Sequence, residues 1–189
     1  MCIRDRVVTN DDALRERVMR VRGQGMDPTK RYWFPEVGYN YRLTNLQAAI
    51  GCGQLDRVNW LLRRHREVAI RYTAAFEGSE HIALPIEQRD CRNVYWLYSV
   101  RFLAAESDES LRDALMERLR EDGIDTRPFF YPMHTMPVYE SDQSFPVAEC
   151  LAASGLNLPS SPNLTDADVD FIASRVLHHV SELAATACV

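Results

Sequence analysis

Residues 32–51 read Y-W-F-P-E-V-G-Y-N-Y-R-L-T-N-L-Q-A-A-I-G, an aromatic-rich loop that runs into a helix. Thr44 and Gln47 form a capping box, because the Thr hydroxyl can accept from the backbone N–H of Gln47 while the Gln side chain reaches back to that of Thr44. Apolar residues then recur at steps of three or four. This spacing predicts a helix as far as about Phe76, with a kink or close packing at the Gly-Cys-Gly of residues 51–53.

The loop before that helix carries two side chains suited to an anion, Asn40 and Arg42. An amide can donate to a phosphate oxygen without adding charge, and a guanidinium is planar and permanently charged, which suits a diphosphate. Loops held at the head of a helix often carry such groups. The same residues are also typical of a turn in which Asn40 is left-handed and of a surface ion pair made by Arg42.

Working outward, the pattern predicts helices that pack on a small sheet. On the N-terminal side, a helix follows Asp11 and ends at Gly23. On the C-terminal side, the predicted elements are a strand over 93–103, a helix from Ser107 or Asp108 to Gly123, extended segments over 124–131 and 156–162, a short helix over 147–154 and a last helix from Thr165. This order indicates an α+β arrangement in the C-terminal part.

A second polar and aromatic cluster lies at residues 127–134, which read R-P-F-F-Y-P-M-H. Two prolines and three aromatic rings make a stiff shelf, and Arg127, Tyr131 and His134 supply its polar atoms. Such a shelf suits a ring joined to an anion, as in a nucleotide sugar. The alternative is a buried turn beneath the C-terminal helix.

Composition excludes several classes of protein. The net charge of −5 argues against a nucleic-acid or membrane-surface protein, and no apolar run approaches the length of a membrane span. The five cysteines are scattered without a C-x-x-C pair, so they indicate reduced cytosolic thiols and neither a disulfide framework nor a zinc site made by cysteines. We therefore expect a cytoplasmic protein.

The blocks quoted above resemble the DegT/StrS group of nucleotide-sugar aminotransferases, which use pyridoxal phosphate (PLP). G-Y-N-Y-R-L-T-N-L-Q-A-A-I-G, residues 38–51, is similar to the signature that follows the active-site lysine in that group. The preceding G-Q-G-M-D-P-T-K-R-Y-W-F-P, residues 23–35, is most similar to the GDP-perosamine synthases. The resemblance implies fold type I, an α/β fold, with Asn40 contacting the PLP phosphate of the other subunit of a homodimer.

The resemblance also implies that this chain lacks the Schiff-base lysine. Lys30 is the one lysine among 22 basic residues, and it lies in a turn-like segment. In the family that lysine precedes the V-V-T-N-D block, here residues 7–11, so we expect no catalytic residue in this chain. Residues 1–6 do not match the family and are predicted to be a foreign leader. Residues 7–77 then correspond to the end of the large domain and the connecting helix, and residues 78–189 to the small domain.

The resemblance predicts that the parent protein moves an amino group from an amino acid, glutamate by expectation, to a nucleotide-linked 4-keto-6-deoxy sugar. Arg42, Arg127, Tyr131 and His134 are the expected contacts of the nucleotide sugar. One alternative is a sugar 3-dehydratase, in which histidine replaces the lysine. Another is a non-catalytic regulatory relative that keeps the fold. We also expect this chain alone to be inactive and to expose apolar surface.

Overall fold

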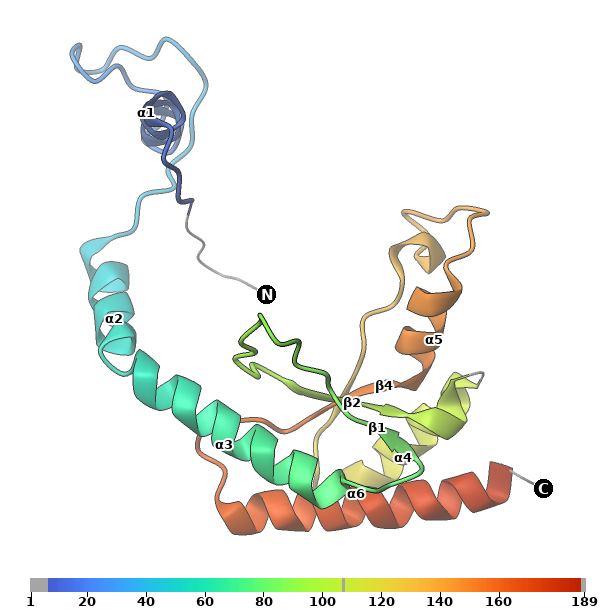
Figure 1. Ribbon diagram of the computed structural model, residues 1–189. Coiled ribbons are helices and arrows are strands. Elements are labelled where there is room, and N and C mark those ends of the chain that lie inside the picture. The colour runs from blue at the N-terminus through green and yellow to red at the C-terminus, as the bar shows by residue number, and fades with distance from the viewer. Residues whose placement is uncertain (1–6, 107, 188–189) are drawn as a thin grey trace. The chain divides into compact units, whose positions relative to one another are not determined.

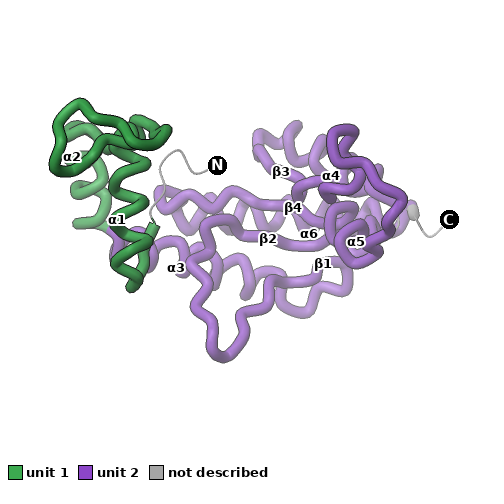
Figure 2. Tube along the Cα trace, turned by 90° about the horizontal axis from the view of Figure 1, so that it is seen from above, with its two compact units in different colours: residues 1–57 green, residues 58–189 purple. Residues whose placement is uncertain are grey.

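The computed structural model describes residues 7–106 and 108–187, so the predicted foreign leader, residues 1–6, lies outside the described residues. The chain divides into two compact units, residues 1–57 and 58–189 (Figure 2). The sequence placed a boundary after residue 77, whereas the structure groups residues 58–77 with the second unit. The assignment of these parts to a large and a small domain stays a prediction.

The first unit contains two helices, α1 (Asp12–Val21) and α2 (Asn45–Leu55) (Figure 1). The predicted capping box at the start of α2 is confirmed. The backbone N–H of Gln47 donates to Thr44 Oγ1 at 3.3 Å, and the backbone N–H of Thr44 donates to Gln47 Oε1 at 3.1 Å. These two bonds satisfy free donors at the helix start and fix the direction in which the preceding loop enters it.

The prediction of one helix from Thr44 to about Phe76 is wrong, because the structure has two helices there, and residues 51–53 lie inside the first of them, α2. The helix ends instead at Leu55. The Arg57 N–H bonds to the Gln54 carbonyl, three residues back, and this tighter turn closes α2 before the next helix begins. An added Cβ on Gly53 would meet no atom within 4 Å, so no close contact in the described chain demands glycine there.

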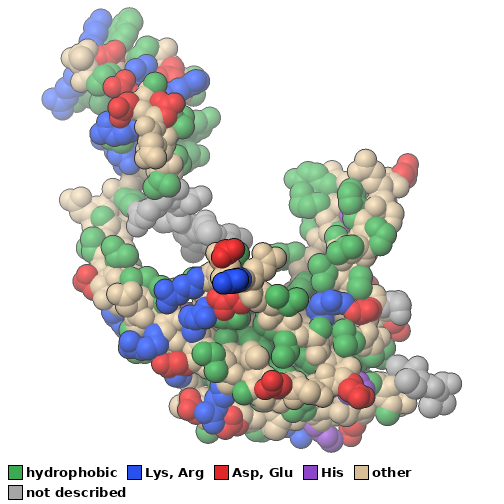
Figure 3. Space-filling model, in the orientation of Figure 1, with side chains coloured by type: hydrophobic (Ala, Val, Ile, Leu, Met, Phe, Trp, Pro, Cys, Tyr) green, Lys and Arg blue, Asp and Glu red, His purple; other side chains and the backbone are tan. Residues whose placement is uncertain are grey.

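The described residues of the first unit form no hydrophobic core, since only two glycines among them are buried. Large apolar side chains are instead exposed at Val8, Tyr32, Val37, Tyr41, Leu46, Ile50 and Leu55. Figure 3 shows hydrophobic side chains at the molecular surface. Exposed apolar side chains also occur in the second unit, but they are denser along the shorter first unit.

The second unit is a four-stranded antiparallel sheet with helices packed on it (Figure 1). The strand order is β1-β2-β4-β3. Its elements are α3 (Val58–Phe76), β1 (Ile82–Ala83), β2 (Tyr98–Phe102), the 3-10 turn η1 (Leu103–Ala105), α4 (Glu109–Glu121), β3 (Arg127–Pro128), the 3-10 turn η2 (Met133–Thr135), α5 (Pro146–Ser154), β4 (Gly155–Leu158) and α6 (Asp166–Ala187).

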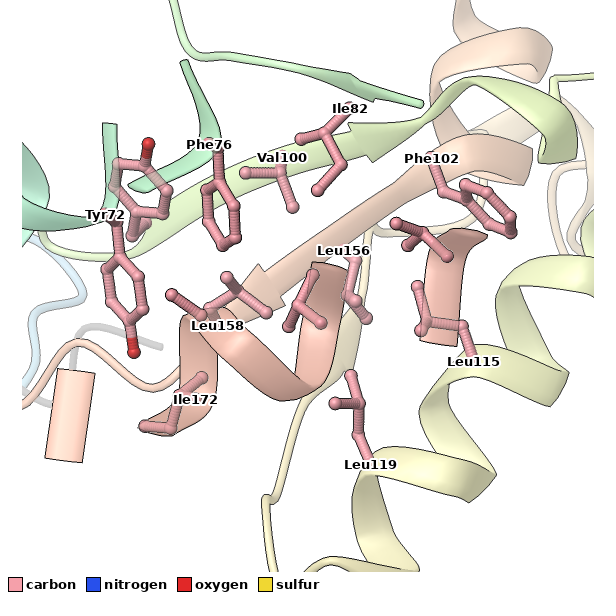
Figure 4. Packing of buried hydrophobic residues seen from close by; sticks show 14 of the residues in the cluster. Tyr72, Phe76, Ile82, Val100, Phe102, Leu115, Leu119, Leu156, Leu158 and Ile172 are labelled. Atoms are coloured by element: carbon pink, nitrogen blue, oxygen red, sulfur yellow. The ribbon is translucent and has the colours of Figure 1, made fainter. Parts of the chain in front are cut away.

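The core lies between one face of the sheet and helices α3, α4 and α6. Figure 4 shows Phe102 of β2 and Leu156 of β4 on the side of Leu115 and Leu119 of α4, with Val100 beside Phe76 and Ile82. The predicted inward stripe of the last helix is confirmed, as its members are at most 6% exposed: Val169, Ile172, Val176 and Val180. This burial is the main source of stability for the unit.

The predicted strand over 93–103 forms only in its second half. Tyr98, Val100 and Phe102 alternate inward as expected. Tyr95, however, has φ of 48°, a left-handed conformation that an extended strand cannot contain. Its N–H donates to the side chain of Asn93 at 2.8 Å, which stabilises a turn there.

Arginines on α3 do more than cover a solvated surface. Arg71 donates to both carboxylate oxygens of Asp170 on α6, each at 2.6 Å. Arg66 makes a paired contact with Glu87 at 3.0 and 3.1 Å. Such forked bonds tie α3 to other segments with defined geometry.

No helix in the described part of the chain is long and apolar enough to cross a membrane.

Candidate functional site

Residues 39–42 form a short extended segment held against the end of α1. Asn40 and Gly23 make an antiparallel bridge. The flanking hydrogen bonds run from Tyr39 N–H to the Val21 carbonyl at 2.7 Å and from Tyr41 N–H to the Arg22 carbonyl at 3.0 Å. The backbone of this segment is thus fixed by main-chain bonds, which leaves its side chains to be positioned by the strand geometry.

Asn40 and Arg42 project from the same face of that segment. Successive side chains in an extended chain alternate between faces. Tyr39 and Tyr41 stack on one another with ring centroids 5.2 Å apart, so they share one face and the two polar residues take the other. Gly23 faces Arg42, since an added Cβ on Gly23 would stand 3.0 Å from Arg42 Nη2. The amide and the guanidinium therefore lie on one side of the segment, as an anion site requires.

Both polar side chains are exposed and available to a ligand. Within residues 7–106 and 108–187, the Asn40 side chain makes no hydrogen bond and Arg42 makes no ion pair. The surface ion pair considered for Arg42 is therefore not found in this part of the chain. Asn40 is also not left-handed, because the non-glycine residues described with positive φ are Gln24, Tyr32 and Tyr95. These observations favour the anion-binding interpretation for both residues.

Two glycines allow the loop to close on itself. Gly25 is left-handed, with φ of 73°, and a Cβ there would stand 2.1 Å from the Glu36 carbonyl oxygen. A Cβ on Gly38 would stand 2.0 Å from the Gly25 nitrogen. Both contacts are with backbone atoms, which cannot rotate away, so any larger residue would push the two strands of the loop apart. The position of Asn40 therefore depends on both glycines.

Lys30 lies in a surface turn, as the sequence predicts. Asp27 Oδ1 accepts from the backbone N–H of Thr29 at 2.8 Å and of Lys30 at 2.9 Å. A bond from the Thr29 hydroxyl first, and these two backbone bonds second, hold the pKa of Asp27 below its usual value. The Lys30 ammonium rests 4.0 Å from the Trp33 ring centroid, a cation–π contact. An exposed ammonium is not the desolvated amine that Schiff-base chemistry requires.

The second predicted cluster is split between two places. Arg127 is exposed on edge strand β3 and lines a pocket of about 550 Å³ with Leu97, Asp125, Asn157, Asp168 and Phe171. Asp125 and Asp168 share that pocket and offset the positive charge of Arg127. The charge of the pocket as a whole therefore does not favour an anion. Tyr131 and His134 are not among the residues lining it.

His134 is bound to a carboxylate of α5. Its Nε2 lies 2.9 Å from Glu149 Oε1, and its ring packs at a tilt on Phe145, with centroids 4.9 Å apart. The same carboxylate oxygen accepts from the Phe145 N–H at 2.7 Å at the start of α5. That backbone bond first, and His134 second, lower the pKa of Glu149. His134 therefore positions the start of α5, while Tyr131 is exposed.

The sequence reasoning missed Asn157 as a neighbour of Arg127. The two residues are paired across β3 and β4, so their side chains share a face of the sheet, and the Asn157 amide donates to the Arg127 carbonyl at 3.3 Å. Ser99 of β2 is the next partner in that row, 2.7 Å from Asn157 Oδ1. A run of polar residues at outward positions of neighbouring strands was the available signal, but it needed the strand register.

Comparison with known proteins agrees with these features. The DegT/DnrJ/EryC1/StrS aminotransferase family matches residues 6–177. The GDP-perosamine synthase of Caulobacter vibrioides is 42% identical over 173 residues, which are 90% of this chain and 46% of that protein. The chain thus spans about half the length of the curated relatives it matches.

Solved structures show the same fold. The aminotransferase TlmJ from Streptoalloteichus hindustanus matches with a TM-score of 0.83 at 29% identity, over 93% of this chain and 47% of TlmJ. The sugar aminotransferase Spr1654 from Streptococcus pneumoniae, solved in its PLP form, matches with a TM-score of 0.83 at 22% identity, over 95% of this chain and 46% of that one. The predicted fold, that of fold type I aminotransferases, is confirmed. The chain belongs to the DegT/DnrJ/EryC1/StrS aminotransferase family.

Proposed function

We propose that the parent protein is a PLP-dependent aminotransferase acting on a nucleotide-linked 4-keto-6-deoxy sugar, with GDP-4-keto-6-deoxymannose as the first candidate and glutamate as the amino donor. The likeness to the Caulobacter GDP-perosamine synthase supports this choice of substrate. The parent would act as a homodimer in the cytoplasm, with each site shared between subunits. A Schiff-base lysine would lie upstream of Val7 in the parent.

The observation that carries the proposal is the exposed polar face formed by Asn40 and Arg42. Its backbone is fixed by the bridge to Gly23, and its side chains make no bond to a described residue that a ligand would have to break. A fixed backbone lowers the ordering cost of binding an anion. These donors suit the phosphate of PLP and the diphosphate of a nucleotide sugar.

Each residue would then have a limited task. PLP, when bound, supplies the electron sink that amino transfer requires. The Asn40 amide would donate to its phosphate from the neighbouring subunit, and Arg42 would hold the diphosphate of the substrate. Arg127 would contact the nucleotide sugar. Tyr131 would add an aromatic surface, and His134 would support this segment through Glu149.

The first experiment measures PLP affinity in the parent protein. Asn40→Ala removes one donor to a charged phosphate, which is worth about 1.5–3 kcal/mol, so the dissociation constant for PLP should rise about tenfold or more. Arg17→Gln, at an exposed position on α1, is the matched control and should leave it unchanged. An unchanged PLP affinity in Asn40→Ala would contradict the assigned role.

A second experiment tests whether Asn40 acts across the dimer. Subunits carrying Asn40→Ala are mixed with subunits in which the Schiff-base lysine is replaced, and activity is measured at limiting PLP. If Asn40 serves the neighbouring site, each mixed dimer holds one complete site and activity rises above that of either variant. If Asn40 serves its own subunit, no complete site forms and mixing restores nothing.

Arg42 and Arg127 are tested through substrate binding. Arg42→Gln and Arg127→Gln should raise KM for the nucleotide sugar while leaving PLP affinity near that of the parent, because both would contact the substrate in its ground state. Variants that lose PLP and leave KM unchanged would place these arginines at the cofactor instead.

A further inference from the structure

Helix α6 carries a cluster of nitrogen and oxygen donors that the proposed function does not use. His178, His179 and Glu182 each offer one ligand atom, and these atoms all lie within 4.8 Å of one another. The helical spacing explains the convergence, since Glu182 is three residues from one histidine and four from the other and lies over both. His178 Nε2 is 3.5 Å from Glu182 Oε1, and His179 Nδ1 is 4.0 Å from Glu182 Oε2.

His179 is oriented by a carboxylate on its far side. The residue is only 7% exposed, and its Nε2 lies 2.7 Å from Oδ2 of Asp122. An ionised carboxylate can only accept, so Nε2 donates to Asp122, and Nδ1 is the ring nitrogen on the side of Glu182. Arg175 Nη2 lies 3.3 Å from the same Nε2, but two N–H groups cannot bond each other, and Arg175 instead donates to Asp122 at 2.7 Å.

The other ring nitrogen of His179, Nδ1, has no partner among the described residues. It is buried and makes no hydrogen bond to any of them. A buried polar atom without a partner is a rare feature, which a ligand or a water would satisfy. Nδ1 lies 4.0 Å from the Glu182 carboxylate. A cation bound there would contact a ring nitrogen and a carboxylate oxygen together.

We propose that His178, His179 and Glu182 bind a divalent transition-metal cation of the zinc class. Two imidazoles and one carboxylate are donors that Zn²⁺ accepts, whereas Mg²⁺ and Ca²⁺ prefer oxygen alone. Ligand bonds of about 2.0–2.1 Å in a tetrahedral site place donor atoms roughly 3.4 Å apart. The two histidine–glutamate separations here are 3.5 and 4.0 Å, so a small side-chain movement would bring the donors to that spacing. Water would complete the coordination.

The surroundings of the cluster support this assignment. A metal-binding histidine commonly donates the N–H of its other ring nitrogen to a carboxylate, and Asp122 already accepts that bond from His179. Arg118 donates to Glu182 Oε2 at 2.8 Å. A carboxylate has about four lone-pair positions, so this bond and a metal bond can coexist. Arg118 and Arg175 offset the charges of Glu182 and Asp122, which leaves the cluster near neutral before the metal binds.

The test is a Zn²⁺ titration of the 189-residue chain, freed of metal, with its exposed thiols alkylated and a chromophoric chelator as competitor. We expect one Zn²⁺ per chain. His178→Gln and Glu182→Gln, at exposed positions that should not affect folding, should lower the affinity at least tenfold. Asp122→Asn should lower it about 10- to 100-fold through loss of the orienting bond. His81→Gln is the matched control and should bind Zn²⁺ with the affinity of the unsubstituted chain.

Thermal unfolding gives an independent measurement. Zn²⁺ binds the folded chain, so it should raise the unfolding midpoint of the unsubstituted 189-residue chain and of His81→Gln. The rise should be smaller in His178→Gln and Glu182→Gln. Absence of Zn²⁺ binding by the unsubstituted 189-residue chain would overturn the proposal. So would equal affinity and equal stabilisation in the His178→Gln and Glu182→Gln variants.

Discussion

The contact between Gly155 and Phe129 determines where the segment with Tyr131 and His134 leaves the sheet. The Phe129 N–H donates to the Gly155 carbonyl at 3.1 Å. A Cβ added to Gly155 would stand 2.1 Å from Cγ and Cδ2 of Phe129 and 2.6 Å from the Leu151 carbonyl oxygen, while real Cβ contacts are essentially never under 3.0 Å. Gly155→Ala must therefore displace both the Phe129 ring and the last turn of α5.

Overpacking of this kind costs about 1–3 kcal/mol. For a chain of this size each kcal/mol shifts the thermal midpoint by about 2–4 °C. We therefore expect Gly155→Ala to lower the midpoint by about 2–12 °C in far-UV circular dichroism of the 189-residue chain. The matched control is Gly53→Ala, where the added methyl group meets nothing within 4 Å. Its midpoint should be equal or higher, since alanine favours a helix interior by about 1 kcal/mol over glycine.

A double-mutant cycle identifies Phe129 as the source of the strain. Phe129→Ala removes the ring and carries its own cost, but it also makes room for the new methyl group. The double variant Gly155→Ala/Phe129→Ala should therefore lose less stability than the two single variants added together. Strict additivity, or a Gly155→Ala midpoint equal to that of the parent, would refute the reasoning.

Three further predictions concern the core, the response to acid and the isolated chain. Leu119→Ala, at a site with 0% exposure, should cost about 2–5 kcal/mol in chemical unfolding, whereas the exposed Ile70→Ala should be nearly neutral. The pKa of Asp122 is lowered by Arg175 first and His179 second, so its folded value lies below its unfolded value. The stabilisation that ionised Asp122 provides is then present above about pH 4 and is lost as the pH falls through the folded pKa. When the pH is lowered below about 4, the free energy of unfolding should therefore fall less in Asp122→Asn than in the unsubstituted chain, as acid unfolding of the two would show. The 189-residue chain should bind a hydrophobic dye and show no transaminase turnover, and either the absence of dye binding or measurable turnover would contradict this.

Local chemistry made the elements near Thr44 and Asp108 predictable. Caps act through bonds to residues two or three positions away, so the short sequence contains all the information they need: Thr44 pairs with Gln47, and Asp108 accepts from Ser110. The break after Leu55 was not predictable in the same way. The glycines at 51–53 marked a plausible weak point, yet the helix continued through them and ended at a turn with no such signal.

Contacts between residues far apart in the sequence were also not predictable from it. Arg127, Tyr131 and His134 lie within eight residues, and the sequence treated them as one site. The structure separates them because Arg127 pairs with Asn157 on the sheet, while His134 bonds to Glu149 on α5. Each partner lies at least 15 residues away, and short-range periodicity contains no information about it.

The two predicted site clusters differ in what holds them in place, and this difference explains how far each prediction went. Asn40 and Arg42 are positioned by a capping box, a bridge to Gly23 and two glycine contacts, all within one short stretch. Their geometry therefore needs no core, which agrees with the exposed apolar side chains around them. Arg127 and His134 depend on a folded sheet and on α5. A substitution such as Gly155→Ala should therefore disturb the second cluster and leave PLP affinity, if Asn40 provides it, unchanged.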